Sequence, residues 1–214
     1  MDYAKIDRLW QSATLLIAPP LIVVLIWLRP GMDEYQWLLW LHLPLLMLHE
    51  AEEYVLAPMS FKEFFNLKTF AGSHTDPNYP LDDGYVFQVN IVLAWPVIIL
   101  GALLAPVAPW LGFSMIWFEL IVNNIMHTVL FQGAKPSYNP GLITNSFLLL
   151  PYATWTLIVA AGFFTPMDWI LSVVVGLGIV AFFATKTRGR IDRMKKMEAA
   201  LAEMATRLRT PSRD

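Results

Sequence analysis

The sequence is organised around residues 41–54, LHLPLLMLHEAEEY. The stretch begins as an apolar, membrane-compatible helix, yet it soon carries two histidines and three carboxylates. An isolated membrane helix tolerates such groups only at a cost of several kcal/mol. At about 100° per residue, His42 and His49 share a helix face, and Glu53 lies one turn beyond His49 on nearly the same line, with Glu52 beside it. Imidazole and carboxylate groups at this spacing either converge on a metal ion or hydrogen-bond to each other.

The composition is typical of a membrane protein rather than of a soluble domain. Of 214 residues, 57% are hydrophobic and 15% are charged, and the mean hydropathy is +0.51. A soluble domain carries about 25% charged residues. The chain has no cysteine, which excludes disulfide and thiolate chemistry. Lys and Arg are concentrated near the C-terminus and the net charge is −2, so nucleic acid is not expected as a partner.

The apolar stretches predict an all-α integral membrane protein, a bundle of about six transmembrane helices. Each stretch is close to the twenty residues that are needed to cross the hydrocarbon region. We therefore expect a six-helix transmembrane domain at residues 1–185 and a basic cytoplasmic tail helix at residues 186–214. The predicted spans are residues 14–28, 36–56, 85–105, 110–131, 141–163 and 167–185.

The basic residues predict the orientation of the bundle. With six spans both termini lie on one side, and the basic residues that follow the sixth span identify that side as cytoplasmic. Only Arg29 is then left outside, so the expected location is the cell (inner) membrane with both termini in the cytoplasm. The expected partners are membrane lipids, through the basic tail, and a second copy of the chain in a homodimer. The aromatic segment 61–70 is expected to lie on the membrane surface.

This topology brings polar residues from four spans to one depth, in the cytoplasmic half of the bundle. On the fourth span they recur at i, i+4 and i+8, a stripe that faces one direction. The convergence is the strongest functional inference that the sequence supports. The residues that meet are His49, Glu52 and Glu53 of span two, Gln88 and Asn90 of span three, Glu119, Asn123 and His127 of span four, and Thr144 and Asn145 of span five.

A divalent metal is the predicted occupant of this cluster. Buried carboxylates with no basic residue at their depth repel one another or take up protons unless a cation lies between them. Nitrogen and oxygen donors without sulfur suit zinc first, and iron or manganese next. Glu119 and His127 have Cα atoms about 12 Å apart along a helix, so they serve either two ions or different roles at one ion. The predicted ligands are His49, Glu52, Glu53, Glu119 and His127.

Other polar residues are expected beside the ligands or in contact with a substrate. A single Asn in a span more often forms an interhelical hydrogen bond than a metal bond, and a histidine near the bilayer middle favours a neutral, hydrogen-bonded state. Glu50 points away from His49 and is expected at the interface, and His74 in a polar loop is expected to be solvated. Residues 136–141 are expected to form the rim of the site. The supporting residues are His42, Asn90, Asn123, Tyr138 and Asn145.

Three motifs resemble those of the HXXEE family of small integral membrane proteins. HEAEEY at 49–54 is similar to the family signature, and NNIMH at 123–127 and YNPGLIT at 138–144 resemble its N-x-x-x-H and Y-x-P-G-x-x-T segments. The resemblance extends from the second span to the fifth. It implies a membrane protein with a metal site at His49, Glu52, Glu53 and His127, and it supplies no reaction.

Three functions are compatible with these residues. The first is a metal-dependent enzyme for a lipid or other apolar substrate, either hydrolytic, with Glu52 or Glu119 accepting a proton from water, or oxidative at a binuclear centre. The alternative is a proton- or cation-coupled transporter that uses the same cluster. The third is an interaction protein whose polar cluster fixes the register of the helices. The polar residues gather in one half of the bundle, which favours an enzyme over a continuous transport path.

Overall fold

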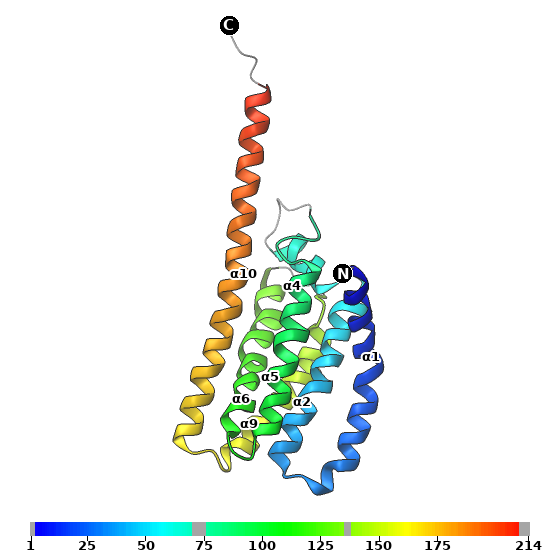
Figure 1. Cartoon of the computed structure of the whole chain (residues 1–214), viewed down its shortest axis with the longest axis vertical. Helices are drawn as coiled ribbons and strands as arrows, with labels where there is room; N and C mark the ends of the chain where they lie inside the picture. The colour runs from blue at the N-terminus through cyan, green and yellow to red at the C-terminus, as the bar shows by residue number, and fades with distance from the viewer. Residues whose placement is uncertain (1–2, 70–75, 135–137, 210–214) are drawn as a thin grey trace.

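The computed structural model describes residues 3–69, 76–134 and 138–209 (Figure 1). All regular secondary structure in these ranges is helical. The fold is an all-α bundle, as the sequence predicts. The α-helices are α1 (Tyr3–Leu28), α2 (Glu34–Ala51), α3 (Phe61–Phe64), α4 (Asp83–Phe87), α5 (Trp95–Leu104), α6 (Pro109–Trp117), α7 (Phe131–Ala134), α8 (Leu142–Thr144), α9 (Leu150–Ala161) and α10 (Pro166–Arg209).

The lengths and hydropathy of the helices confirm a membrane bundle. Five of the described helices are long and apolar enough to cross a membrane, and they correspond to the predicted spans other than the second. The second, α2 with its continuation to Leu56, lies inside the bundle with most of its side chains buried. Its polar residues reduce its hydropathy, while its neighbours supply the apolar surface. The five are Leu9–Gly31, Asp83–Leu104, Pro109–Leu130, Leu142–Ala161 and Pro166–Ala205.

The four helices that carry the polar cluster all change to π-helical turns near it. Such turns are rare in proteins and are frequent at functional sites. In contrast, α1 and α10 are regular α-helices throughout their described lengths, and neither contributes a residue to the predicted metal ligands. The π-helical segments of these four helices are Glu52–Leu56, Gln88–Ala94, Phe118–Asn123, Ile125–Leu130 and Asn145–Leu149, and a further one, Phe65–Thr69, follows α3.

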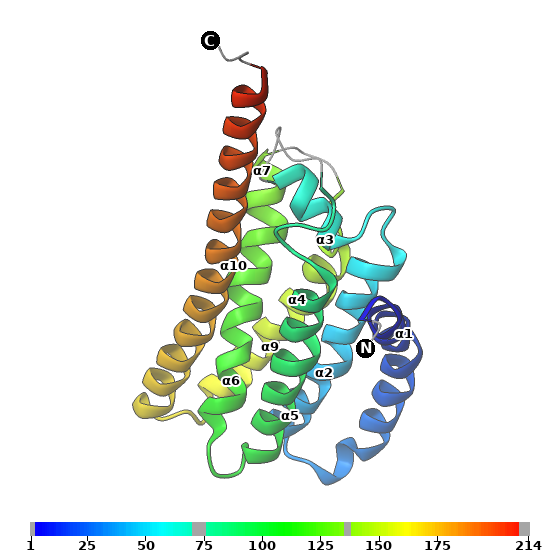
Figure 2. The ribbon, with the colours of Figure 1, turned by 45° about the horizontal axis from the view of Figure 1, so that its top comes forward.

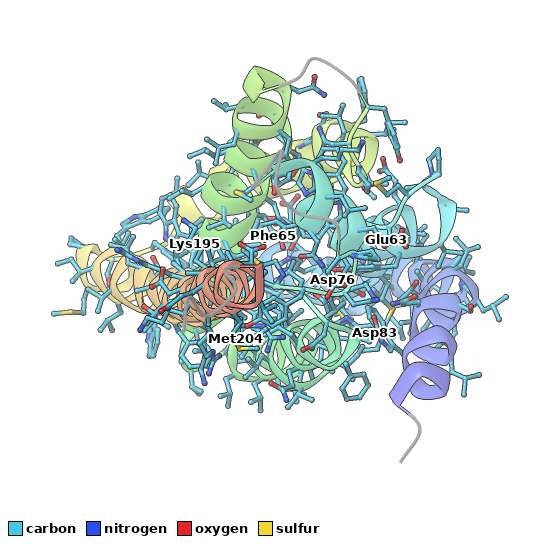
Figure 3. The ribbon with its side chains drawn as sticks, turned by 90° about the horizontal axis from the view of Figure 1, so that it is seen from above. Glu63, Phe65, Asp76, Asp83, Lys195 and Met204 are labelled. Atoms are coloured by element: carbon cyan, nitrogen blue, oxygen red, sulfur yellow. The ribbon has the colours of Figure 1, made fainter. Side chains whose placement is uncertain are left out.

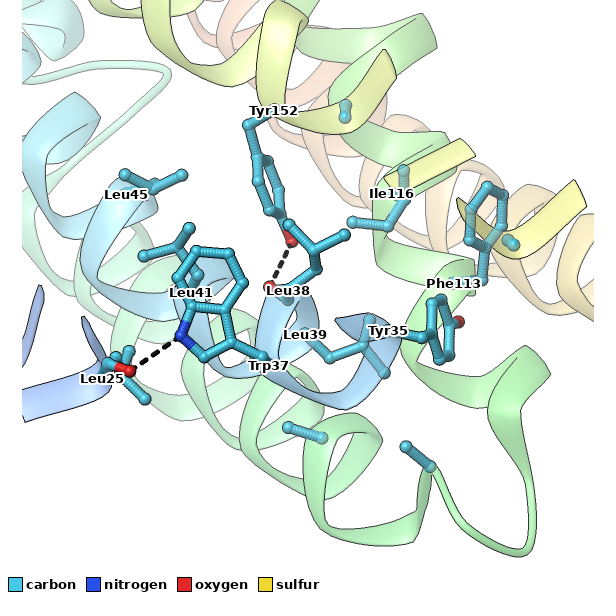
Figure 4. Close-up of a cluster of buried hydrophobic side chains, with 14 of the residues drawn as sticks. Leu25, Tyr35, Trp37, Leu38, Leu39, Leu41, Leu45, Phe113, Ile116 and Tyr152 are labelled. Carbon is cyan, nitrogen blue, oxygen red and sulfur yellow. Dashed lines mark hydrogen bonds between the residues drawn. The ribbon is translucent and has the colours of Figure 1, made fainter. Parts of the chain in front are cut away.

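An apolar core packs around the first half of α2 and fixes its position. Trp37 donates its indole N–H to the carbonyl of Leu25 on α1 at 2.8 Å, and Tyr152 on α9 donates its hydroxyl to the carbonyl of Leu38 at 3.0 Å (Figure 4). Both aromatic residues thereby bury their rings and still satisfy their polar atoms. The core therefore holds α1, α2 and α9 together below the polar cluster.

Glycines allow α2, α5 and α6 to approach closely. A Cβ atom on Gly101 of α5 would lie 2.6 Å from the Cα atom of Gly112 on α6. A Cβ atom on Gly112 would in turn lie 2.4 Å from Cδ1 of Leu39 on α2. Small residues at such crossings are typical of membrane helices, which pack without a hydrophobic driving force between them. The close contact brings the polar residues of the fourth span against α2.

The segment that follows α2 folds over one end of the bundle. Figure 2 shows α3 at the same end as α7, and Figure 3 shows Phe65 near the middle of this end. Phe61 and Phe131 have ring centroids 5.9 Å apart. The aromatic side chains of the described part of residues 61–70 therefore pack onto the fourth span, and the position of this segment at the membrane surface stays a prediction.

One continuous helix, α10, contains both the sixth span and the described part of the basic tail. Figure 1 shows it extending beyond the rest of the bundle. Arg190 forms an ion pair with Asp82, and the hydroxyl of Tyr79 donates to the carbonyl of Arg190 at 3.1 Å. Tyr85 and Thr187 share a further hydrogen bond of 2.7 Å. These contacts attach α10 to α4 and to the loop before it.

Candidate metal centre

Three buried residues of the predicted ligand set converge: His49 of α2, Glu53 of the following π-helical turn, and His127 of the fourth span. Each offers one ligand atom, and these atoms lie within 4.8 Å of one another. The Nε2 atoms of His49 and His127 are 3.5 Å and 3.4 Å from the same oxygen, Oε1 of Glu53. The two imidazole rings meet edge to face, with centroids 5.1 Å apart. We call these residues the three-residue group.

Asn139 fixes the tautomer of His127. Its amide Nδ2 donates to the backbone carbonyl of His127 at 3.1 Å, and a carbonyl oxygen can only accept. The other amide atom, Oδ1, therefore faces Nδ1 of the imidazole at 2.8 Å and accepts its proton. His127 consequently carries its proton on Nδ1, and its Nε2 presents a lone pair to the three-residue group.

A hydrogen-bonded chain from Glu52 through Thr144 fixes His49 in the same way. The hydroxyl of Thr144 lies 2.6 Å from Oε2 of Glu52 and 2.8 Å from Nδ1 of His49. The hydroxyl has one proton, which it donates to the carboxylate, so it accepts a proton from Nδ1 of His49. The Nε2 atom of His49 is therefore also an acceptor.

The three facing atoms of the group are thus all acceptors. The hydrogen bonds at the two Nδ1 atoms place no proton between these three atoms, and all three belong to buried residues. A divalent cation satisfies all three at once, and a proton satisfies only one pair. Two nitrogens and one oxygen form the donor set of several catalytic zinc sites, and the second ring nitrogen of such ligands is commonly held by an acceptor.

Glu52 lies outside the three-residue group and anchors the start of the fifth span. Its Oε1 accepts from the hydroxyl of Tyr138 and from the amide of Ile143, both at 3.1 Å. Its Oε2 accepts from the amide and the hydroxyl of Thr144, both at 2.6 Å. Four donors satisfy a carboxylate in its ionised form. Burial and the neighbouring charge of Glu52 raise the pKa of Tyr138 to about 12, so the phenol stays a donor at neutral pH.

Gly141 closes the group from the side of the fifth span. Its φ of +91° lies in the left-handed region that favours glycine. A Cβ atom there would lie 2.7 Å from Cε1 of His127, 2.7 Å from Cε1 of His49 and 3.1 Å from Cγ of Glu53. A side chain at this position would therefore collide with every member of the three-residue group.

Glu119 belongs to a second buried set. Its Oε1 lies 3.0 Å from Nε2 of His42, and its Oε2 accepts from the amide of Asn123 at 2.6 Å. His42 and Glu119 are both almost fully buried. The structure therefore separates the predicted ligands into the three-residue group, the anchoring Glu52, and Glu119 with its partners His42 and Asn123.

Both sets meet at one cavity of about 410 Å³. Its walls include all of the three-residue group as well as Glu119 and Asn123. Most of the remaining lining residues are apolar, and they come from the second, third and fourth spans, α3 and α10. A cavity with this lining suits an apolar molecule that carries a few polar atoms.

The other predicted residues occupy less central positions. Asn90 lines the cavity and donates to the hydroxyl of Tyr54 at 3.5 Å. Asn145 is buried, and neither of its amide atoms has a hydrogen-bond partner among the described residues. Of the predicted rim, Tyr138, Asn139 and Gly141 contact the site. Residues 136 and 137, and His74, lie outside the described residues.

The positions of Glu50, Asn139 and Gly141 differ from what the sequence predicted. Glu50 is buried rather than interfacial, and both of its carboxylate oxygens lie 3.0 Å from the indole nitrogen of Trp95. Asn139 and Gly141 hold the site although neither was expected to contact a ligand. The signal that identifies the last two is the segment YNPGLIT itself, where an Asn and a Gly follow a turn directly before a span.

Comparison with known proteins places the motifs of this site in one family. Residues 40–156 match the family described as "Protein of unknown function with HXXEE motif". The match covers more than half of the chain, so the protein belongs to the HXXEE family. No curated protein and no solved structure matches the chain.

Proposed function

We propose that this HXXEE protein is a metal-dependent membrane enzyme that hydrolyses a lipid or another apolar substrate. The observation that carries the proposal is the three-residue group, whose three acceptor atoms face one another at the wall of a largely apolar cavity. A site for packing alone has no need of two histidines whose tautomers are both set to expose Nε2. An apolar cavity beside these atoms gives a hydrophobic substrate access to them.

Zinc fits the three-residue group best. Catalytic zinc sites use three protein ligands and keep the fourth position for water or substrate, and two His with one Glu is an established set. Iron and manganese accept the same donors, and one ion is sufficient for the three residues that converge. When bound, such an ion lowers the pKa of a coordinated water to about 7 and so supplies a nucleophile at neutral pH.

Glu119 is the better of the two predicted proton acceptors. It lines the same cavity as the three-residue group, and only two donors, His42 and Asn123, contact its carboxylate in the described part of the chain. Glu52 receives four hydrogen bonds, which stabilise its charge and leave it no free lone pair toward the cavity. We assign proton transfer to Glu119, with His42 holding its orientation, and we assign positioning of His49 to Glu52.

The basic residues of α10 support a cytoplasmic location for this site. They follow the apolar part of α10 at the same end of the bundle as the loop before α4, as the contact of Arg190 with Asp82 requires. Under the positive-inside rule we infer that this end faces the cytoplasm, and we propose the cell membrane as the location. The substrate then reaches the cavity from the inner leaflet.

Turnover in reconstituted vesicles tests the proposal. Purified protein is inserted into vesicles of total membrane lipid, metal is removed with a chelator, and zinc, iron or manganese is added back before lipids and their products are compared by mass spectrometry. We expect new hydrolysis products only with metal, and none from His127→Ala. Glu119→Gln should lose turnover while the exposed control Glu34→Gln keeps it. Proton or cation flux across the same vesicles without any lipid product would contradict the proposal and favour a transporter.

A further inference from the structure

A cleft between the third span and α10 has an apolar part that lies within the predicted membrane region. It is a cavity of about 360 Å³, and all of its lining residues are apolar or glycine. Leu93 and Val97 of the third span face Val175 and Gly178 of α10 across it, and Met115 of α6 closes it. No polar group in this lining could recognise a hydrophilic ligand. The space suits a hydrocarbon chain.

The same cleft has a basic part directly beyond the apolar one. This smaller cavity, of about 170 Å³, is lined by Gln88, Lys186, Arg190 and Arg193 among others. The two parts share three wall residues and are therefore neighbours along one cleft. The shared residues are Leu93, Phe182 and Phe183.

Two of the three cations in the basic part are available for a ligand. Arg190 is neutralised by Asp82 and donates to the carbonyl of Pro80. Lys186 contacts the ring of Phe182, with Nζ 5.5 Å from the ring centroid, but neither Lys186 nor Arg193 forms a hydrogen bond or ion pair with any residue of the described ranges. No acidic residue lines the basic part. Their charge is uncompensated at the level where a bilayer presents its headgroups.

The cleft borders the cavity that contains the three-residue group. The basic part shares Tyr85 and Val89 with that cavity, and the apolar part shares Ala94 and Met115 with it. A molecule bound in the cleft therefore lies beside the candidate metal site.

We propose that this cleft binds an anionic membrane lipid, with one hydrocarbon chain in the apolar part and the headgroup on Lys186 and Arg193. Charge complementarity and the order of the two parts, apolar inside the membrane and basic at its surface, match such an amphiphile. A free phosphate would use only the basic part, and a neutral lipid only the apolar one. That the bound lipid is also the substrate rests on the proposed function, whereas its binding does not.

Binding of the headgroup to Lys186 and Arg193 is tested with protein in neutral detergent. The protein is titrated with short-chain phosphatidylglycerol and, separately, with phosphatidylcholine that has the same acyl chains. Binding is measured by native mass spectrometry. We expect tighter binding of phosphatidylglycerol, and a loss of about 25-fold in Lys186→Gln/Arg193→Gln, since each surface cation contributes about a fivefold factor. The control Lys195→Gln/Lys196→Gln removes the same charge from α10 outside the cleft and should change binding less than threefold.

Binding of the hydrocarbon chain of the lipid is tested with a substitution whose side chain fills the apolar part of the cleft. A Cβ atom on Gly178 meets no atom within 4 Å, so Gly178→Leu extends into the cavity without a backbone clash, and Gly189→Leu is a matched control elsewhere on α10. We expect the first variant to lose phosphatidylglycerol binding at least tenfold and the second to keep it. Thermal unfolding verifies that both variants fold.

Three results would overturn the inference: equal affinity for the two lipids, unchanged binding in Gly178→Leu, or competition by inorganic phosphate that abolishes binding. A separate readout distinguishes this inference from the proposed function. Glu53→Ala/His127→Ala should bind phosphatidylglycerol like the wild type, because neither residue lines the cleft. Lipid binding together with an absence of metal would leave the inference standing and remove the proposed function.

Discussion

Replacement of Gly141 by alanine perturbs all three members of the candidate metal centre with one methyl group. The backbone at φ +91° disfavours any residue with a Cβ atom, and left-handed conformations cost about 1–2 kcal/mol. The new Cβ would also lie 2.7 Å from an atom of each histidine, whereas ordinary contacts begin at 3.4 Å. Each ring must therefore move by about 0.7 Å, the difference of these distances, or the fifth span must withdraw.

Such a movement should weaken metal binding more than it weakens the fold. The Nδ1 bonds to Asn139 and Thr144 hold both rings in place, and loss of such supporting bonds commonly costs 10- to 100-fold in metal affinity. We therefore expect the zinc affinity of Gly141→Ala to be about 10- to 100-fold lower than that of the wild type. The assay is competition against a chromophoric zinc chelator in detergent, with thermal unfolding measured in parallel.

Gly178→Ala and Gly189→Ala are the matched controls, because a Cβ atom at either position meets nothing within 4 Å. Both should retain wild-type zinc affinity. A folded Gly141→Ala protein whose zinc affinity stays within twofold of the wild type would refute the reasoning. That result would mean that the imidazoles are free to move without loss, or that they do not ligate.

The remaining predictions concern the residues that hold the site. Asn139→Ala should free the tautomer of His127 and reduce zinc affinity about 10- to 100-fold in the same competition assay, with Asn139→Asp retaining more of it. Thr144→Val removes the hydroxyl between Glu52 and His49 and should weaken zinc binding similarly, whereas Thr144→Ser should restore it. Glu119→Gln should keep the wild-type zinc content and lose turnover by about 10²- to 10⁴-fold, and loss of zinc in this variant would instead make Glu119 a ligand.

The sequence predicted the pairing of His49 with Glu53 from their i, i+4 spacing, and the pairing is present although Glu53 lies in the π-helical segment that follows α2. Residues four apart then face the same side, and the burial of polar groups without a basic partner indicated a cation. His127 was also correctly expected near them from the matching depth of the second and fourth spans. These inferences used only periodicity and topology, which the apolar stretches determine.

On the fourth span, the α-helical period does not predict which side chains share a face. Glu119 and His127 were expected on one stripe, but the π-helical segments Phe118–Asn123 and Ile125–Leu130 replace the α-helical geometry between them. A π-helical turn holds more residues than an α-helical one, so an α-helical wheel does not describe which side chains share a direction. Glu119 consequently pairs with His42, while His127 faces Glu53.

Tertiary contacts account for the other differences. Glu50 is buried because the indole of Trp95, on the third span, approaches its carboxylate. The sequence pattern of α2 alone does not indicate this contact. Likewise, the ring centroid of Phe61 lies 5.7 Å from that of His127, a contact that the sequence pattern did not indicate. The identity of the metal, the orientation in the membrane and the homodimer stay predictions.

Metal content is the measurement that tests the central claim most directly. Wild-type protein purified in detergent without added metal or chelator is analysed by elemental mass spectrometry beside Glu53→Ala/His127→Ala and beside the exposed control Glu34→Ala. We predict about one equivalent of zinc, iron or manganese in the wild type and the control, and none in the double variant, because the three facing acceptors require a cation. Metal-free wild type, or metal that persists in a folded double variant, would contradict the account.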